Sequence, residues 1–120
     1  MKHLLFCSAL TAILATVTIG PAMAGSTHDG AWSLNFVTQR GACDRTYNFD
    51  VNISNGNVSH PNLVKFKGRV TPSGLVHASV AVGDKYASGS GTMSQSNGRG
   101  TWNGLMGSAR CSGYWTAQRT

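Results

Sequence analysis

The sequence predicts one small all-β domain, an antiparallel meander of seven or eight strands that closes into a barrel or a sandwich and carries one disulfide. Three observations predict this fold class. Apolar residues recur at every second position over most of the chain, which is the period of a half-buried strand. Turn-forming residues interrupt this pattern about every 8–12 residues, which leaves no room for crossover helices. Glycine is frequent, with 15 copies, and strong helix formers are few.

Residues 1–24 have the pattern of a cleavable secretory signal. Lys2 and His3 supply a positive start, residues 4–20 are almost continuously apolar, and residues 21–24 end in the small-x-small motif of a cleavage site. A membrane anchor is the alternative, but a run of about 17 residues is at the lower limit for a span and no basic flank follows it. Cys7 lies inside this run and is expected to leave with the signal. We therefore expect an all-β domain at residues 25–120, periplasmic or secreted, with no membrane span after cleavage.

Cleavage leaves two cysteines, Cys43 and Cys111, and an even number in an oxidising compartment favours a disulfide. A bond between them would close a loop of 68 positions, which contributes roughly 4 kcal/mol to stability in the chain-entropy model. Cys43 follows the first expected strand and Cys111 opens the last one, and these two strands become neighbours when a meander closes. A redox or metal-binding pair is the alternative, which the missing C-x-x-C spacing weakens. We expect Cys43 and Cys111 to be bonded to each other.

The first expected strand lies around residues 32–36 and the second around residues 47–54, where the alternation is clearest. Asn55-Gly56 follows, the dipeptide best suited to the positive φ angles of a two-residue hairpin turn. A short return strand near residues 57–60 ends at Pro61, which cannot donate to a strand ladder. The residues expected on the apolar faces of the first two strands are Trp32, Leu34 and Phe36, followed by Tyr47, Phe49, Val51 and Ile53.

Three further turns separate the remaining strands. They are expected at Thr71-Pro72-Ser73-Gly74, at Gly83-Asp84 and at Ser96-Asn97-Gly98. Glycines inside the later strands predict strong curvature or a close approach of two backbones. The remaining expected strands are residues 64–70, 76–82, 86–94, 101–106 and 111–118.

After residue 24 the chain carries nine Lys or Arg against four Asp and no Glu, a net charge of about +5 that favours anionic partners. Lys65, Lys67 and Arg69 project from one face of one expected strand and form the best candidate for an anion-binding row. The alternative is an edge strand whose positive charge blocks edge-to-edge pairing. The expected partner is an unknown protein or an anionic polymer, and no pattern indicates a specific nucleic-acid contact.

The polar residues predict no catalytic site, no metal site and no cofactor. The four Asp residues are scattered, so hydrolysis by paired carboxylates has no second carboxylate to use. No G-x-S-x-G nucleophile motif accompanies the Ser, His and Asp residues. His28, His60 and His77 match no zinc spacing, and we expect them to be solvated or turn residues rather than ligands.

Each tryptophan follows small residues, in Asp29-Gly30-Ala31-Trp32, Gly98-Arg99-Gly100-Thr101-Trp102 and Ser112-Gly113-Tyr114-Trp115. Rings that fill the space left by glycines explain this repetition, and an aromatic platform for a ligand is the alternative. Together with Gly41-x-Cys43-Asp44, the order of these motifs resembles a group of small exported bacterial β proteins, some of which carry a label of haem utilisation or adhesion. The resemblance covers nearly all of the chain after residue 24. It implies an exported β domain and supplies no ligand residues to carry over.

These observations favour an exported binding or interaction module over an enzyme. A rigid β scaffold would present its basic row and polar loops to an anionic partner, or would inhibit an extracytoplasmic enzyme. Haem or metal handling is the alternative that the resemblance suggests. A hydrolase is less favoured, because no catalytic set is visible.

Overall fold

The computed structural model describes residues 27–63 and 65–120, so the expected signal at residues 1–24 and the residue Val64 lie outside the described residues. In the described part the fold is all-β, and eight antiparallel strands close into a barrel in which β8 returns to pair with β1. No helix in this part is long and apolar enough to cross a membrane. The predicted fold class is therefore confirmed, and of its two variants the barrel is found. The strands are β1 (Gly30–Arg40), β2 (Thr46–Ser54), β3 (Asn57–Ser59), β4 (Phe66–Val70), β5 (Leu75–Val82), β6 (Lys85–Met93), β7 (Asn97–Met106) and β8 (Ala109–Arg119).

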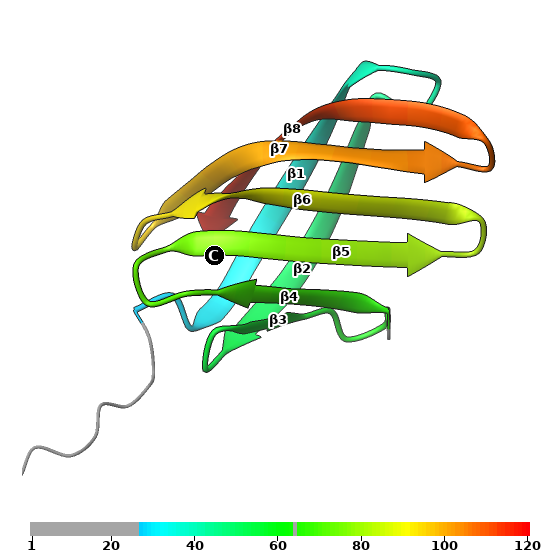
Figure 1. Ribbon diagram of the computed structural model, residues 1–120. Helices are drawn as coiled ribbons and strands as arrows, with labels where there is room; N and C mark the ends of the chain where they lie inside the picture. The colour runs from blue at the N-terminus through cyan, green and yellow to red at the C-terminus, as the bar shows by residue number, and fades with distance from the viewer. Residues whose placement is uncertain (1–26, 64) are drawn as a thin grey trace, which may run out of the picture.

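The barrel has two ends with different connections (Figure 1). Strands β5 to β7 form one layer, and β1 and β2 cross behind it at a steep angle (Figure 1). One end, which we call the open end, carries the β1–β2, β3–β4, β5–β6 and β7–β8 connections. The opposite end, which we call the closed end, carries the β2–β3, β4–β5 and β6–β7 turns and the start of the described chain. The two ends are closed to different degrees by their side chains.

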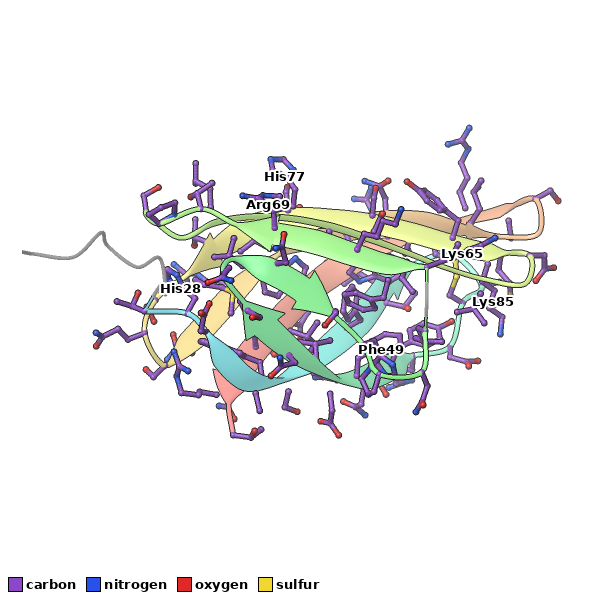
Figure 2. The ribbon with its side chains drawn as sticks, turned by 90° about the horizontal axis from the view of Figure 1, so that it is seen from below. His28, Phe49, Lys65, Arg69, His77 and Lys85 are labelled. Atoms are coloured by element: carbon purple, nitrogen blue, oxygen red, sulfur yellow. A yellow bond between two sulfur atoms is a disulfide. The ribbon has the colours of Figure 1, made fainter. Side chains whose placement is uncertain are left out.

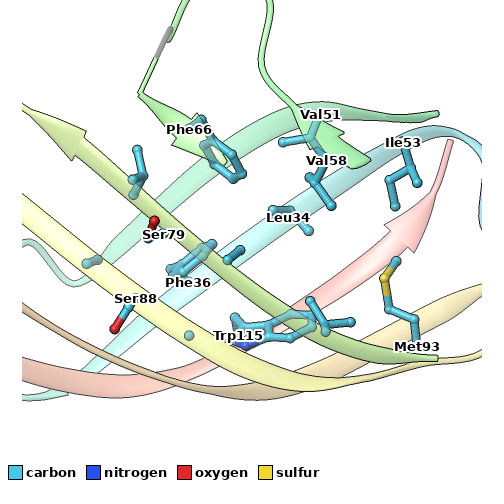
Figure 3. Close-up of a pocket in the computed structure, with 15 residues that line it drawn as sticks. Leu34, Phe36, Val51, Ile53, Val58, Phe66, Ser79, Ser88, Met93 and Trp115 are labelled. Atoms are coloured by element: carbon cyan, nitrogen blue, oxygen red, sulfur yellow. The ribbon is translucent and has the colours of Figure 1, made fainter. Parts of the chain in front are cut away.

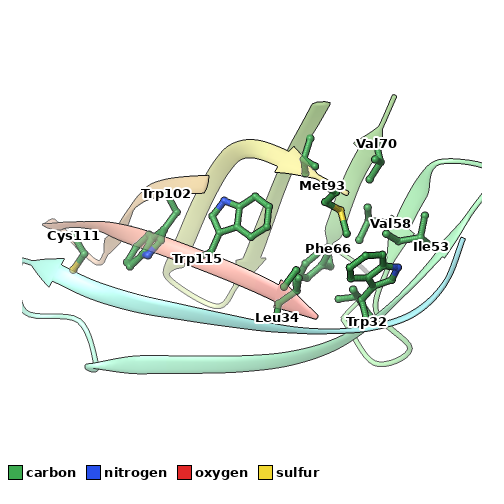
Figure 4. Packing of buried hydrophobic residues seen from close by; sticks show 13 residues of the cluster. Trp32, Leu34, Ile53, Val58, Phe66, Val70, Met93, Trp102, Cys111 and Trp115 are labelled. Atoms are coloured by element: carbon green, nitrogen blue, oxygen red, sulfur yellow. The ribbon is translucent and has the colours of Figure 1, made fainter. Parts of the chain in front are cut away.

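The interior follows the alternation that the sequence predicts. In β1, Trp32 and Leu34 are buried and Phe36 is half-buried, and in β2 the exposed positions alternate with the inward Val51 and Ile53. Thirteen buried residues form one continuous core along the barrel axis (Figure 4). They are Trp32, Leu34, Val51, Ile53, Val58, Phe66, Val70, Val76, Met93, Trp102, Cys111, Trp115 and Ala117.

Glycines in β6, β7 and β8 provide the space that two of the tryptophan rings fill. A Cβ atom added to Gly100 or Gly91 would lie 2.6 Å or 2.7 Å from the Trp115 ring, and one added to Gly113 would lie 3.0 Å from Trp102 Nε1. The indole N–H of Trp115 donates to the carbonyl of Ser90 at 3.2 Å. The repeated Gly and Trp residues therefore pack the core, as the simpler of the two interpretations predicts.

The predicted turns form where expected, with one exception. Asn55 and Gly56 have φ angles of 54° and 80°, as a two-residue hairpin turn requires. The prediction that Ser96-Asn97-Gly98 is a turn was wrong, because β7 already begins at Asn97. Gly98 pairs with Met93 in the ladder, and a Cβ atom there would lie 2.7 Å from the Met93 side chain. This glycine is thus required for packing rather than for a turn.

The predicted disulfide is present between Cys43 and Cys111. The two Cα atoms lie 6.0 Å apart although 68 positions separate them in the sequence. Cys43 belongs to the β1–β2 connection and Cys111 to β8, so the bond fixes that connection against the barrel wall at the open end.

Candidate functional site

The closed end is sealed by the residues that precede β1. Trp32 is completely buried, and its indole N–H donates to the carbonyl of His28 at 2.8 Å. The carboxylate of Asp29 accepts hydrogen bonds from the backbone N–H groups of Asn55 and Gly56 at 3.0 Å and 3.3 Å. The segment is thereby tied to the β2–β3 turn, and it covers the ring that fills this end.

The open end contains a cavity of about 300 Å³. This volume is at the lower limit of the range that small-molecule sites occupy. Apolar and aromatic side chains from the open ends of five strands and two loops supply most of its lining. The lining residues are Phe36, Cys43, Tyr47, Phe49, Leu63, Val80, Val82, Lys85, Tyr86, Ala87, Trp102, Leu105 and Met106.

The floor of this cavity lies partway down the barrel. Phe36, Val80 and Ala87 line it and also line a second, inner cavity of about 40 Å³ (Figure 3). These three side chains therefore form the layer between the two spaces. The inner cavity has room for a water molecule or two, and its lining is almost entirely apolar. The open-end cavity is therefore separated from the inner cavity by packed side chains.

Aromatic rings in edge-to-face and tilted contacts build the lower wall. The ring centroid of Phe36 lies 5.7 Å from that of Phe49 and 6.0 Å from that of Trp102. Phe49 in turn lies 5.7 Å from Phe66 and 6.0 Å from the His60 ring. Such contacts hold rings at fixed angles, so Phe36, Phe49 and Trp102 form a fixed part of the lining. Phe66 and His60, which do not line the cavity, support Phe49.

The β1–β2 connection forms a second part of the wall and is held in place by several contacts. The backbone N–H of Thr38 donates to the carbonyl of Arg45 at 2.8 Å, and its hydroxyl donates to the carbonyl of Asp44 at 2.5 Å. The Tyr47 hydroxyl accepts from the Asp44 backbone N–H at 3.0 Å. With the disulfide at Cys43, these contacts fix Tyr47 at the rim of the cavity.

The rim exposes apolar surface to solvent. Of the five large hydrophobic side chains that are exposed in the described part of the chain, three line this cavity, namely Val82, Tyr86 and Leu105. They are 46%, 49% and 38% exposed, respectively. Tyr86 and Leu105 are ladder partners on the register that alternates with Val80 and Val82, so the exposed apolar surface lies on both faces of the rim.

Positive charge surrounds the same opening. Figure 2 shows Lys65 and Lys85 at the end of the barrel opposite His28. The acidic residues at the open end are Asp44 and Asp84. The basic residues there are Arg40 at the end of β1, Arg45 before β2, Lys65 before β4, Lys85 at the start of β6 and Arg110 near the start of β8. The opening therefore carries an excess of positive charge.

The three residues of the predicted anion-binding row, Lys65, Lys67 and Arg69, do not lie together on one strand. Lys67 and Arg69 are exposed on the outer face of β4, opposite Ser79 and His77 of β5, whereas Lys65 precedes β4 and is exposed at the open end. Arg69 also donates to the side-chain oxygen of Asn57 at 3.0 Å. Strand β4 pairs with β3 at Arg69 and Gly68 as well as with β5, so this part of it is not an edge. The edge-protection alternative was therefore wrong for Arg69.

The three histidines lie on different parts of the barrel. His28 lies at the closed end and His77 is exposed on the outer face of β5 (Figure 2). His60, in the connection between β3 and β4, stacks on the ring of Phe66. Within residues 27–63 and 65–120, no three His, Cys, Asp or Glu side chains gather as metal ligands would.

Sequence reasoning missed the open-end cavity. Its inward positions Val80 and Val82 were visible in the alternation, and Gly83-Asp84 marked the end of their strand. The expected strand that follows began at residue 86, whereas β6 begins at Lys85 and pairs it with Val82 and Met106. That register places Lys85 in the cavity lining instead of in a solvated turn.

Comparisons with protein-family models, with curated proteins and with solved structures find no significant match to this chain.

Proposed function

We propose that this protein is an exported binding module that holds a small apolar ligand in the open end of its barrel. The observation that carries the proposal is the cavity of about 300 Å³, lined by aromatic and aliphatic side chains, at the open end of a closed barrel. The closed end is filled by Trp32, and the interior is packed. Eight-stranded barrels are wide enough to hold one small ligand, and here the space for it lies at the open end, above the packed interior.

The disulfide supports export, because such bonds form and persist in oxidising compartments. It joins the wall of the cavity to β8, so it also stabilises the binding end. The signal expected at residues 1–24 agrees with this location. Periplasmic and fully secreted forms of the protein would use the same site.

A binding module needs no catalytic group, and the cavity lining fits that role. Among the lining residues, only Lys85 carries a charge. Two tyrosines supply the hydroxyl groups of the lining, and its one cysteine is held in the disulfide. Such a lining holds an apolar group by burial and shape, with each buried methylene contributing about 0.8 kcal/mol.

The test uses the neutral dye N-phenyl-1-naphthylamine, whose fluorescence rises in apolar surroundings. The purified protein should bind it saturably at one site per chain. Val82→Glu places a carboxylate in the rim of the cavity, and it should weaken binding roughly tenfold. Leu75→Glu is the matched control, because Leu75 is also an exposed aliphatic residue, at the other end of the same strand, β5.

An unchanged dye affinity in Leu75→Glu with a loss in Val82→Glu supports the proposal. Equal affinities in the parent protein and in Val82→Glu would contradict it, as would the absence of saturable binding.

A further inference from the structure

We infer that the ligand of the open end is a compact, ring-containing organic anion, such as an aromatic carboxylate or sulfonate, and that Lys85 binds its anionic group. This inference rests on the proposed function, because it names the class of ligand that the same cavity takes. Three properties of the cavity carry it: the position of one cation, the charge around the rim and the depth of the apolar space.

Lys85 is the one charged residue among those that line the cavity. It is the first residue of β6, and its ladder partners Val82 and Met106 line the cavity beside it. None of the described residues accepts a hydrogen bond from its ammonium group or forms an ion pair with it. The cation is therefore available to a ligand, at the boundary between apolar lining and solvent.

The two acids at this end are positioned to leave Lys85 available. Asp84 lies toward the β7–β8 turn, where its carboxylate oxygen would be 3.6 Å from a Cβ atom on Gly107 and its carbonyl accepts from the Gly107 N–H at 3.0 Å. Asp44 lies in the β1–β2 connection, where its backbone is hydrogen-bonded to Thr38 and Tyr47.

The other cations at the open end reinforce the preference for an anion. Arg40, Arg45, Lys65 and Arg110 are all exposed there. Together with Lys85 they outnumber the two acids, and a basic rim of this kind raises the local concentration of anions and repels cations. The same excess disfavours quaternary ammonium ligands, which aromatic cavities otherwise bind well.

The depth of the cavity limits the apolar part of the ligand. Below the layer of Phe36, Val80 and Ala87 there is space of only about 40 Å³. Trp102, at the edge of the floor, is fixed by its own hydrogen bond, because its indole N–H donates to the carbonyl of Val37 at 3.1 Å. A long acyl chain would have to displace this packing, whereas one or two fused rings fit above it.

The aromatic share of the lining favours rings over branched aliphatic groups. Five of the lining residues are aromatic, and they come from four different strands: Phe36, Tyr47, Phe49, Tyr86 and Trp102. Rings at several orientations can accept a flat ligand through both edge-to-face and offset contacts.

Two dyes that share one ring system test the anionic part of this inference. 1-Anilinonaphthalene-8-sulfonate differs from N-phenyl-1-naphthylamine only by its sulfonate group. At low ionic strength the parent protein should bind the sulfonated dye roughly fivefold more tightly or better than the neutral dye, and Lys85→Met should remove most of this difference between the two dyes. Lys67→Met, on the outer face of β4, should keep the preference of the parent protein.

The outcomes separate this inference from the proposed function. If both dyes bind but the sulfonate brings no gain, or if Lys85→Met keeps the gain, the inference is overturned and the proposed function stands. If neither dye binds saturably, the proposed function fails. A competition experiment tests the size limit: 2-naphthoate should displace the sulfonated dye, and tighter displacement by palmitate would overturn the expectation of a compact ligand.

Discussion

Arg119 lies over the indole ring of Trp32, with its guanidinium carbon 4.6 Å from the ring centroid. The same guanidinium donates to three backbone carbonyls, those of Thr27 at 2.5 Å, Asp29 at 2.6 Å and Gln95 at 2.9 Å. One side chain near the end of β8 therefore joins the segment before β1 to the β6–β7 turn. This arrangement closes one end of the barrel, whereas the other end contains the cavity.

Replacing Arg119 by Met should lower the free energy of unfolding by about 1–3 kcal/mol, because the charge-assisted hydrogen bonds and the contact with the ring are lost together. Urea denaturation measures this change. Arg110→Met, at an exposed position of β8 near the open end, should stay within about 0.5 kcal/mol of the parent protein. Equal stability of the two variants would show that Arg119 does not seal the closed end.

Reduction of the Cys43–Cys111 bond should lower the unfolding midpoint markedly. A loop of 68 positions corresponds to roughly 4 kcal/mol in the chain-entropy description. Because Cys43 lines the open-end cavity, the Cys43→Ser/Cys111→Ser variant should also bind the neutral dye more weakly. Thiol counting on denatured, unreduced protein checks the bond itself, and two free thiols from these cysteines would contradict it.

Gly100→Ala should destabilise the barrel by about 3 kcal/mol or more, because a Cβ atom there would lie 2.0 Å from the carbonyl oxygen of Ser90 and 2.6 Å from Trp115 Nε1. Thermal unfolding measures the loss. Gly83→Asn is the control, since nothing lies within 4 Å of a Cβ atom at Gly83 and Asn tolerates its φ of 61°. A Gly100→Ala variant as stable as the control would contradict the packing of Trp115 against glycine.

The outer face of β4 should contribute to retention on a heparin-like resin. Lys67→Gln/Arg69→Gln should elute at a lower salt concentration than the parent protein, with no loss of thermal stability, because both side chains are exposed. Lys65→Gln should have a smaller effect, since it removes one charge from a different part of the surface. Equal elution of the double variant and the parent protein would exclude an anion-binding role for this pair.

Local features of the sequence predicted most of the fold. The alternation of apolar residues located the strands, and Asn55-Gly56 located a turn through its positive φ angles. The disulfide followed from the cysteine count after the expected cleavage. Each of these features depends on residues that are close in sequence or on a simple count, so it can be recognised without knowledge of the three-dimensional arrangement.

The cavity at the open end could not be predicted, because it depends on contacts between distant parts of the chain. Whether the end of a barrel is open depends on which residues cover it. At the closed end, the Arg119 guanidinium donates a hydrogen bond to the carbonyl of Asp29, although 90 positions separate the two residues in the sequence. Lys85 next to the Gly83-Asp84 turn has the pattern of a solvated turn residue. Only its register against Met106 places it in the cavity lining.

The most direct test of the central claim is an amide chemical-shift titration of isotope-labelled protein with N-phenyl-1-naphthylamine. The claim that the barrel binds its ligand at the open end predicts saturable shifts at Tyr47, Val82 and Met106, with little change at Trp32 of the closed end. Shifts concentrated around Trp32, or spread without saturation over the outer face of β5 and β6, would contradict it.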